Sequence, residues 1–141
     1  MNKETKSKII SIVIGVVTFP LFYFGVQKFL KKDLESQLKE AVLEINKSAP
    51  MNVSKLSRLD SASIIGKKEF IYHYTLITTA KNQVNMDTVN KYIRPTIIEN
   101  VKTNSDLKIY RDNNITLKYK YYDKNGEFAM EIPVTPELYK E

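Results

Sequence analysis

The chain has 141 residues, a net charge of +6, no cysteine and a single histidine. Without cysteine it forms no disulfide and offers no thiolate to a metal, and the lone His73 excludes a multi-histidine metal site. The charge excess is spread along the chain: eight basic and five acidic residues precede residue 49, and 14 basic and 11 acidic residues follow it. Nucleic-acid binding needs positive charge concentrated on one surface, so a DNA or RNA partner is not expected.

An apolar run dominates the N-terminal part of the chain. Residues 9–30 contain no acid, and their only lysine is Lys28. About 20 apolar residues are enough to cross about 30 Å of hydrocarbon, so this run predicts a membrane-spanning helix. A cleaved signal peptide would have a shorter apolar region and a cleavage site of small residues. We therefore expect a short tail, residues 1–8, followed by an uncleaved signal-anchor over residues 9–30.

Lysines flank the apolar run on both sides, so the positive-inside rule leaves the two orientations nearly balanced. A short N-terminal tail before a long C-terminal domain is the usual layout of a signal-anchor. This layout favours a single-pass protein of the bacterial inner membrane, with its C-terminal domain on the periplasmic, extracytoplasmic side.

Residues 31–48 predict a neck helix. Apolar side chains recur there at helical spacing: Leu34, Leu38, Ala41, Val42 and Ile45. The pattern stops before Pro50, because proline disfavours helix at the residue that precedes it. Two interpretations are open: the apolar stripe packs on the following domain, or it forms a short coiled coil and a weak homo-oligomer. About two heptads fit, whereas a coiled coil needs three or four, so packing is favoured.

Residues 49–141 predict a small α+β domain. Two pairs of segments alternate apolar and polar side chains, residues 58–65 with 69–79 and residues 115–123 with 127–134. A turn containing glycine joins the two members of each pair, which is typical of antiparallel hairpins. The last strand is expected to place four apolar side chains on one face: Phe128, Met130, Ile132 and Val134.

A helix is expected between the two hairpins. Asp87 is the predicted N-cap, and apolar residues follow it at a spacing of four. Pro95 falls inside this helix and is expected to kink it. The predicted fold class is thus α+β, with an N-terminal transmembrane helix followed by a small two-layer domain in the order α-β-β-α-β-β, built from antiparallel hairpins.

Residues arranged for catalysis are scarce. The chain has four glycines and contains no glycine-rich phosphate-binding motif and no Gly-x-Ser-x-Gly motif. Asp112 and Asp123 are interpreted as loop and turn residues. We expect no enzymatic activity, no metal and no cofactor.

Three polar side chains on the first predicted hairpin are candidates for contact with a partner. Arg58 and Asp60 flank a leucine on the same side of the first strand. They form either a structural ion pair at the strand end or a charge pair that faces a partner. His73 is the one side chain that titrates near neutral pH, and it lies on the strand face opposite its two tyrosine neighbours.

Tyrosine is common on the predicted strands, at Tyr72, Tyr74, Tyr119, Tyr121 and Tyr122. A tyrosine-lined sheet face can bind a peptide, a glycan or a lipid headgroup, but cross-strand packing in the core, with hydroxyls that reach water, is the favoured interpretation. Tyr122 shares the polar face of its strand with Lys118 and Lys120. It is the tyrosine expected to be exposed and is the fourth candidate for partner binding.

Four stretches follow one another in a recognisable order: Ala49-Pro50-Met51-Asn52-Val53, Ser57-Arg58-Leu59-Asp60, Tyr72-His73-Tyr74-Thr75-Leu76 and Tyr121-Tyr122-Asp123-Lys124-Asn125-Gly126. Together they resemble a family of small bacterial exported or membrane-anchored proteins with the pattern TRLD, then YxYTL, then YxYxDxxG. The resemblance covers roughly residues 46–136 and implies the fold and an envelope location rather than an activity. Members often carry two cysteines. This chain has Lys102 and the Tyr139-Lys140 region at those places, so the disulfide that would indicate an oxidising compartment is missing.

These observations favour a non-catalytic, membrane-anchored binding or accessory protein of the bacterial envelope, with an unidentified protein partner. The alternative is an inhibitor or immunity-type protein that meets a toxin or hydrolase at the membrane.

Overall fold

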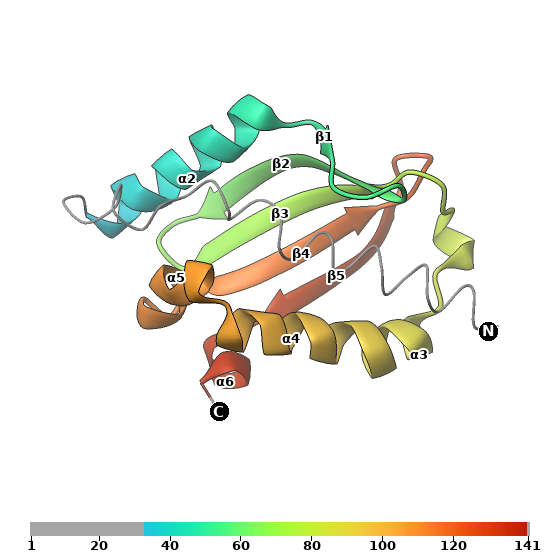
Figure 1. The fold of residues 1–141 in the computed structure, drawn as a ribbon. Coiled ribbons are helices and arrows are strands. Elements are labelled where there is room, and N and C mark those ends of the chain that lie inside the picture. Colours follow the sequence, from blue (N-terminus) through green and yellow to red (C-terminus); the bar gives the residue numbers. More distant parts are fainter. Residues whose placement is uncertain (1–32, 141) are drawn as a thin grey trace.

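The computed structural model describes residues 33–140. Its centre is one five-stranded sheet in the order β1-β2-β3-β4-β5. Figure 1 shows helix α2 along the β2 side of this sheet and helices α3 and α4 along the β5 side. The strands are β1 (Met51–Asn52), β2 (Ser57–Ile65), β3 (Glu69–Leu76), β4 (Thr116–Tyr122) and β5 (Phe128–Val134). The helices are α2 (Leu34–Ser48), α3 (Met86–Thr88), α4 (Arg94–Thr103), α5 (Lys108–Asp112) and α6 (Pro136–Tyr139), with shorter turns η3 (Lys81–Gln83), η4 (Val89–Ile93) and η5 (Ser105–Leu107).

Both predicted hairpins are present, because β2 pairs with β3 and β4 pairs with β5 in antiparallel fashion. The two hairpins meet at β3 and β4, which run parallel. Parallel neighbours need a crossover connection, and the chain from α3 to α5 supplies it. This crossover carries the helix layer back across one face of the sheet.

One hydrophobic core joins the helices to that face. The sheet contributes alternate residues of each strand, and among the most deeply buried are Phe70, Tyr72, Tyr74, Leu117, Tyr119, Tyr121, Ile132 and Val134. The helices contribute Leu38, Ala41, Ile45, Ile93, Ile97 and Val101 to the same core. Because successive side chains of a strand point to opposite faces, the other face of the sheet carries the intervening, mostly polar residues.

Helix α2 is fastened to the sheet by packing and by hydrogen bonds. Asp33 caps its first turn by accepting the backbone N–H of Ser36 at 3.0 Å. Near its end the Asn46 side chain donates to the Ala62 carbonyl at 3.1 Å and accepts the Ala62 N–H at 2.8 Å. The apolar stripe of the predicted neck helix is therefore used within the chain, as the favoured interpretation expected.

The helix between the hairpins differs in two details from the prediction. Its N-cap is Asn85, whose side chain accepts the N–H of Thr88 at 3.1 Å, and Asp87 lies inside the first turn. Pro95 falls in the first turn of α4, directly after the π-helical turn η4. The helix runs from α3 through η4 into α4 without a break, so Pro95 removes an intrahelical hydrogen bond, and a π-helical turn next to it is a usual way for a helix to adjust.

The predicted fold class is wrong as stated. The sheet has a fifth strand, β1, and a parallel pair at its centre, whereas the sequence pattern predicted two antiparallel hairpins alone. Within residues 33–140, no helix is long and apolar enough to cross a membrane. The transmembrane signal-anchor predicted over residues 9–30 lies outside the described residues.

Phe128 is also on the other face from the one predicted. Met130, Ile132 and Val134 are buried as expected, but Phe128 is 43% exposed. The register of β4 with β5 shifts between Tyr121 and Tyr122, so that Phe128 stands opposite Tyr122 instead of continuing the alternation. A bulge of this kind re-aims one side chain, and a pattern with a period of two does not reveal it.

Candidate functional site on the open face of the sheet

The face of the sheet away from the core collects most of the polar side chains of the strands. We call it the open face and define it by the residues that point there: Arg58, Asp60, Ser61 and Ser63 from β2; Ile71, His73 and Thr75 from β3; Lys118, Lys120 and Tyr122 from β4; and Phe128 and Glu131 from β5. All four side chains that the sequence marked for partner contact, Arg58, Asp60, His73 and Tyr122, lie on it. The parallel pairing of β3 with β4 brings them together, since it sets His73 beside Lys120 and Thr75 beside Tyr122.

Arg58 and Asp60 form an ion pair. The Arg58 Nε donates to Asp60 Oδ1 at 2.5 Å, and the Thr75 hydroxyl donates to the other carboxylate oxygen. Asp60 stands at the register irregularity of β2, which brings its carboxylate back toward Arg58. Both interpretations of this pair from the sequence stay open, because it is a structural ion pair whose members are also partly exposed.

His73 bonds across the β2–β3 hairpin. Its Nε2 lies 2.8 Å from the Ser63 hydroxyl, and its ring stacks with the ring of Tyr122 at 6.4 Å between centroids. Partial burial lowers the pKa of His73, the nearby Lys120 ammonium lowers it further, and Asp60 opposes both. The imidazole is thus held in its neutral form near neutral pH.

Aromatic rings and one lysine gather where β4 and β5 join. Phe128 meets Tyr122 edge to face, with 6.2 Å between the ring centroids. The Lys120 ammonium lies 5.9 Å from the Tyr122 centroid and 5.6 Å from the Phe128 centroid, within the range of cation–π attraction. We call Lys120, Tyr122 and Phe128 the aromatic corner. The sequence marked Tyr122 but missed Phe128, because the register shift that exposes it leaves no mark on the alternation.

The tyrosines of the covered face pack against one another in the core and are not exposed to a partner. Tyr72 stacks on Tyr119 and Tyr74 stacks on Tyr121, in each case with ring centroids 5.3 Å apart. All four side chains are buried, which confirms the packing interpretation. The prediction that the tyrosine hydroxyls reach water is wrong for Tyr119 and Tyr121, whose hydroxyls are buried and make no hydrogen bond to any described residue.

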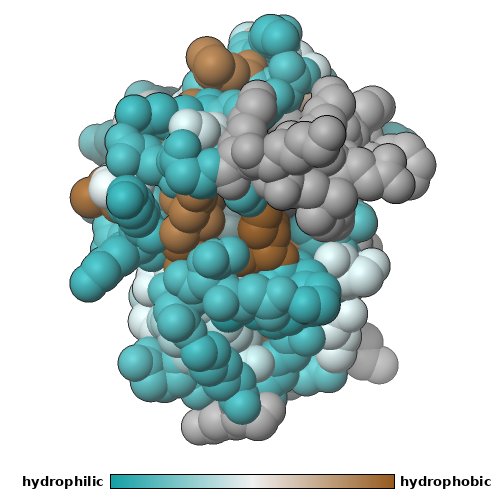
Figure 2. Space-filling model, turned by 90° about the vertical axis from the view of Figure 1, so that its left-hand side faces the viewer, coloured by the Kyte–Doolittle hydropathy of each residue, from teal (hydrophilic) through white to brown (hydrophobic). Residues whose placement is uncertain are grey.

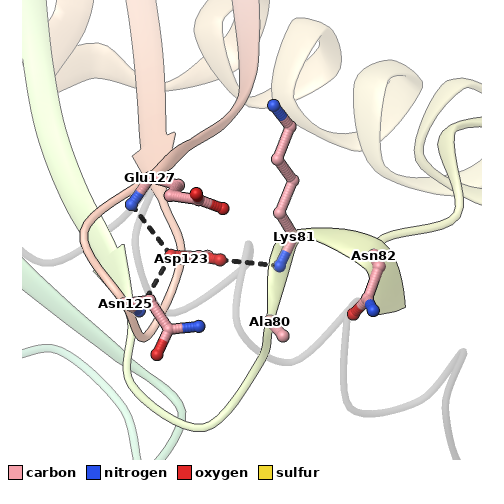
Figure 3. Close-up of a pocket in the computed structure, with 6 residues that line it drawn as sticks. All are labelled: Ala80, Lys81, Asn82, Asp123, Asn125 and Glu127. Atoms are coloured by element: carbon pink, nitrogen blue, oxygen red, sulfur yellow. Dashed lines mark hydrogen bonds between the residues drawn. The ribbon is translucent and has the colours of Figure 1, made fainter.

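A pocket of about 440 Å³ lies at the β4–β5 turn, lined by Ala80, Lys81, Asn82, Asp123, Asn125 and Glu127. Figure 3 shows three hydrogen bonds that converge on the Asp123 carboxylate, from the backbone N–H groups of Lys81, Asn125 and Glu127 at 2.8, 2.8 and 2.9 Å. Burial raises the pKa of Asp123, but these donors outweigh it and hold the pKa below its usual value. The carboxylate therefore acts as a clamp that links the turn to the η3 segment.

Exposed apolar side chains are few and scattered. Leu43, Ile65, Met86 and Phe128 are the large apolar residues of the described chain that are exposed. Figure 2, which shows the side of the molecule on the left of Figure 1, has a mostly hydrophilic surface with brown atoms confined to a recess and a few isolated spots. Scattered apolar residues are normal on a protein surface. Phe128 differs from the others because it belongs to a cluster of rings and charge.

Three solved bacterial structures are similar to this fold. The pilotin AspS of the Vibrio cholerae type II secretion system has a TM-score of 0.56 and 16% identity, over 81% of this chain and 99% of that one. EpsS, the pilotin of the Vibrio vulnificus type 2 secretion system, has a TM-score of 0.60 and 11% identity, over 77% and 93% of the two chains. A candidate secreted protein from Pseudomonas aeruginosa has a TM-score of 0.63 and 13% identity, over 74% and 91%. At these identities the likeness shows the fold alone.

The family of this chain is clear from its sequence. The family described as Domain of unknown function (DUF8479) matches residues 30–129, and the chain belongs to it. No curated protein matches the sequence. The narrower motif pattern proposed from the sequence, from TRLD to YxYxDxxG, stays a prediction.

Proposed function

We propose that this chain is a non-catalytic accessory protein of the bacterial envelope that binds a protein partner through the open face of its sheet. Two fold neighbours are pilotins of type II secretion systems and a third is a candidate secreted protein, which supports an accessory role on the extracytoplasmic side. This support rests on shared fold, so the surface itself has to carry the rest of the proposal.

The observation that carries it is the composition of the open face. Arg58, Asp60, His73 and Tyr122 lie there together with Phe128, an aromatic side chain that is 43% exposed. Tyrosine, phenylalanine and arginine are the residues enriched in protein interfaces, and well-ordered aromatic anchors surrounded by polar groups are typical of such surfaces. The other face is filled by the core and has no comparable surface to offer.

The arrangement also supports binding over catalysis. Arg58 and Asp60 form an ion pair with each other, and the Ser63 hydroxyl is hydrogen-bonded to His73. A Ser–His pair can serve a nucleophilic mechanism only if a third group orients the imidazole and donors stabilise the developing oxyanion. Here the His73 ring instead stacks on the ring of Tyr122, and its pKa is lowered by burial and by Lys120. These features describe a pre-ordered contact surface.

Site-specific photo-crosslinking in the native host tests the proposal. The photoreactive residue benzoylphenylalanine replaces Phe128 on the open face or, as a matched control, Leu43, which is 62% exposed on α2. We expect a discrete adduct with an envelope protein from position 128 and none of that size from position 43. Equal adducts from both positions, or none from position 128, would contradict the proposal.

A further inference from the structure

We propose that the aromatic corner binds a carboxylate side chain of the partner, with an apolar side chain next to it on the exposed ring of Phe128. The partner class is therefore a protein segment in which Asp or Glu neighbours an aromatic or aliphatic residue. This inference rests on the proposed function, because it names the chemistry that the same surface recognises.

The first step is the distribution of charge on the open face. The Arg58 guanidinium is matched by Asp60. The Lys118 ammonium is shared by two carboxylates, 3.0 Å from Glu69 Oε1 and 4.0 Å from Glu131 Oε1. These contacts neutralise Arg58 and Lys118. Lys120 is the remaining cation among the open-face residues defined above.

The Lys120 ammonium makes cation–π contacts with two aromatic rings instead of an ion pair with a carboxylate. Glu131 stands directly opposite it in the β4–β5 register, yet the Glu131 carboxylate lies toward Lys118. Within residues 33–140, no carboxylate oxygen lies within 4.0 Å of the Lys120 ammonium, which rests against Tyr122 and Phe128. The neighbouring His73 is biased toward its neutral form and adds little competing charge.

This arrangement suits a carboxylate better than other anions. The rings hold the ammonium in place, so little side-chain freedom is lost when an anion binds, and partial burial strengthens the attraction relative to water. Nucleic acid would need several uncompensated cations in a row, and the open face offers a single one. The exposed part of Phe128 gives an apolar neighbour of the carboxylate a surface to cover.

Two blocked dipeptides serve as defined probes, acetyl-Phe-Glu-amide and its neutral analogue acetyl-Phe-Gln-amide. Each is titrated into the isotopically labelled full-length chain and followed by amide chemical shifts. We expect the Glu peptide to shift the amides of Lys120, Tyr122 and Phe128 and to bind about two- to fivefold more tightly than the Gln peptide, as a partly exposed ion pair allows. Lys120→Gln should abolish this preference. Lys91→Gln is the matched control, because the Lys91 ammonium also lies over a tyrosine ring, 5.3 Å from the Tyr92 centroid, on the helix between the hairpins.

Equal affinity for the two peptides, shifts confined to other parts of the chain, or a preference that survives Lys120→Gln would each overturn the inference. The photo-crosslink from position 128 separates this failure from that of the proposed function. If the adduct forms at full yield in a Lys120→Gln background, the open face binds its partner without the carboxylate subsite. If position 128 gives no adduct, the proposed function fails whatever the peptides do.

Discussion

The two faces of the sheet are built from the same strands but differ in whether their polar groups have partners. On the covered face, Tyr119 and Tyr121 bury their rings and leave hydroxyls without a partner among the described residues. On the open face, nearly every charged group is matched by a neighbour at hydrogen-bond or ion-pair distance, and one lysine is matched by rings alone. The covered face therefore contributes stability through buried apolar area, and the open face contributes an ordered pattern of charge.

The largest expected difference between the faces is in the free energy of unfolding. Ile132 on the covered face of β5 is 0% exposed, whereas Ile65 at the end of β2 is 57% exposed. We expect Ile132→Ala to lower the free energy of unfolding by about 2–5 kcal/mol, since it removes buried methylenes and leaves a cavity. Ile65→Ala should change it by less than about 1 kcal/mol. Denaturant unfolding followed by circular dichroism measures both. Equal losses of stability would mean that Ile65 is buried in the folded chain. The proposed difference between the two faces would then fail at the end of β2.

A smaller loss is expected from the clamp at the β4–β5 turn. Asp123 uses both carboxylate oxygens to accept three backbone N–H groups, and Asn can offer only one oxygen while its amide group would face a donor. Asp123→Asn should thus destabilise the fold, though by less than Ile132→Ala.

The same clamp predicts a pH dependence. The pKa of Asp123 is held below its usual value in the folded chain, so its contribution to stability is complete above the unfolded pKa of about 4 and is lost as the pH falls through the lower folded value. Denaturant midpoints between pH 7 and pH 3 should therefore fall less steeply in Asp123→Asn than in the parent chain. Parallel curves would show that the carboxylate titrates alike in both states and does not act as a clamp.

Local patterns in the sequence predicted the sidedness of most strands but not the way in which the strands assemble. The alternation in residues 116–122 and 69–76 placed the tyrosines and His73 on the correct faces, because more and less buried side chains alternate along β4 and, apart from the buried Ile71, along β3. The parallel pairing of β3 with β4 joins segments far apart in the chain, and no local pattern encodes which strands become neighbours. Strand β1 has two residues, too few for an alternation to be visible.

The same limit applies to the candidate site. Arg58, Asp60, His73 and Tyr122 stood out because a charged or polar side chain on a strand is visible in the sequence. Their convergence on one surface depends on the β3–β4 pairing, and the exposure of Phe128 depends on a register shift. Both are tertiary features, which arise only when the hairpins meet.

A stabilising change is predicted on the covered face. The Tyr121 hydroxyl is buried and has no partner among residues 33–140, so it has lost its hydrogen bonds to water without a replacement there. Tyr121→Phe keeps the ring and its stacking on Tyr74 and removes the buried oxygen. We expect the free energy of unfolding to rise by up to about 1 kcal/mol. A loss of stability instead would indicate that the hydroxyl has a partner in the folded chain. Tyr139→Phe is the matched control, because the Tyr139 hydroxyl donates to the Ile115 carbonyl at 2.8 Å and its removal should destabilise.

The smallest effect, and the one most specific to the open face, is the titration of His73. Partial burial, then Lys120, lower its pKa below the ordinary value of about 6.5, and Asp60 opposes them. Because the folded pKa is lowered, the stability linked to this histidine is complete above the unfolded pKa and declines as the pH falls through the folded value. The chain has one histidine, so the carbon-bound imidazole protons give a single NMR titration curve. Lys120→Gln should raise this pKa, and Asp60→Asn should lower it further.

The histidine also reports on the aromatic corner. Lys120 stands beside His73 in the β3–β4 register, so an anion that binds to Lys120 screens the ammonium and brings negative charge toward the imidazole. Saturation with acetyl-Phe-Glu-amide should consequently raise the pKa of His73, and acetyl-Phe-Gln-amide should leave it unchanged. In Lys120→Gln the pKa should start higher and no longer respond to the Glu peptide. A pKa that rises equally with both peptides would indicate burial of the ring rather than capture of a carboxylate, because simple coverage of the surface does not depend on the charge of the probe.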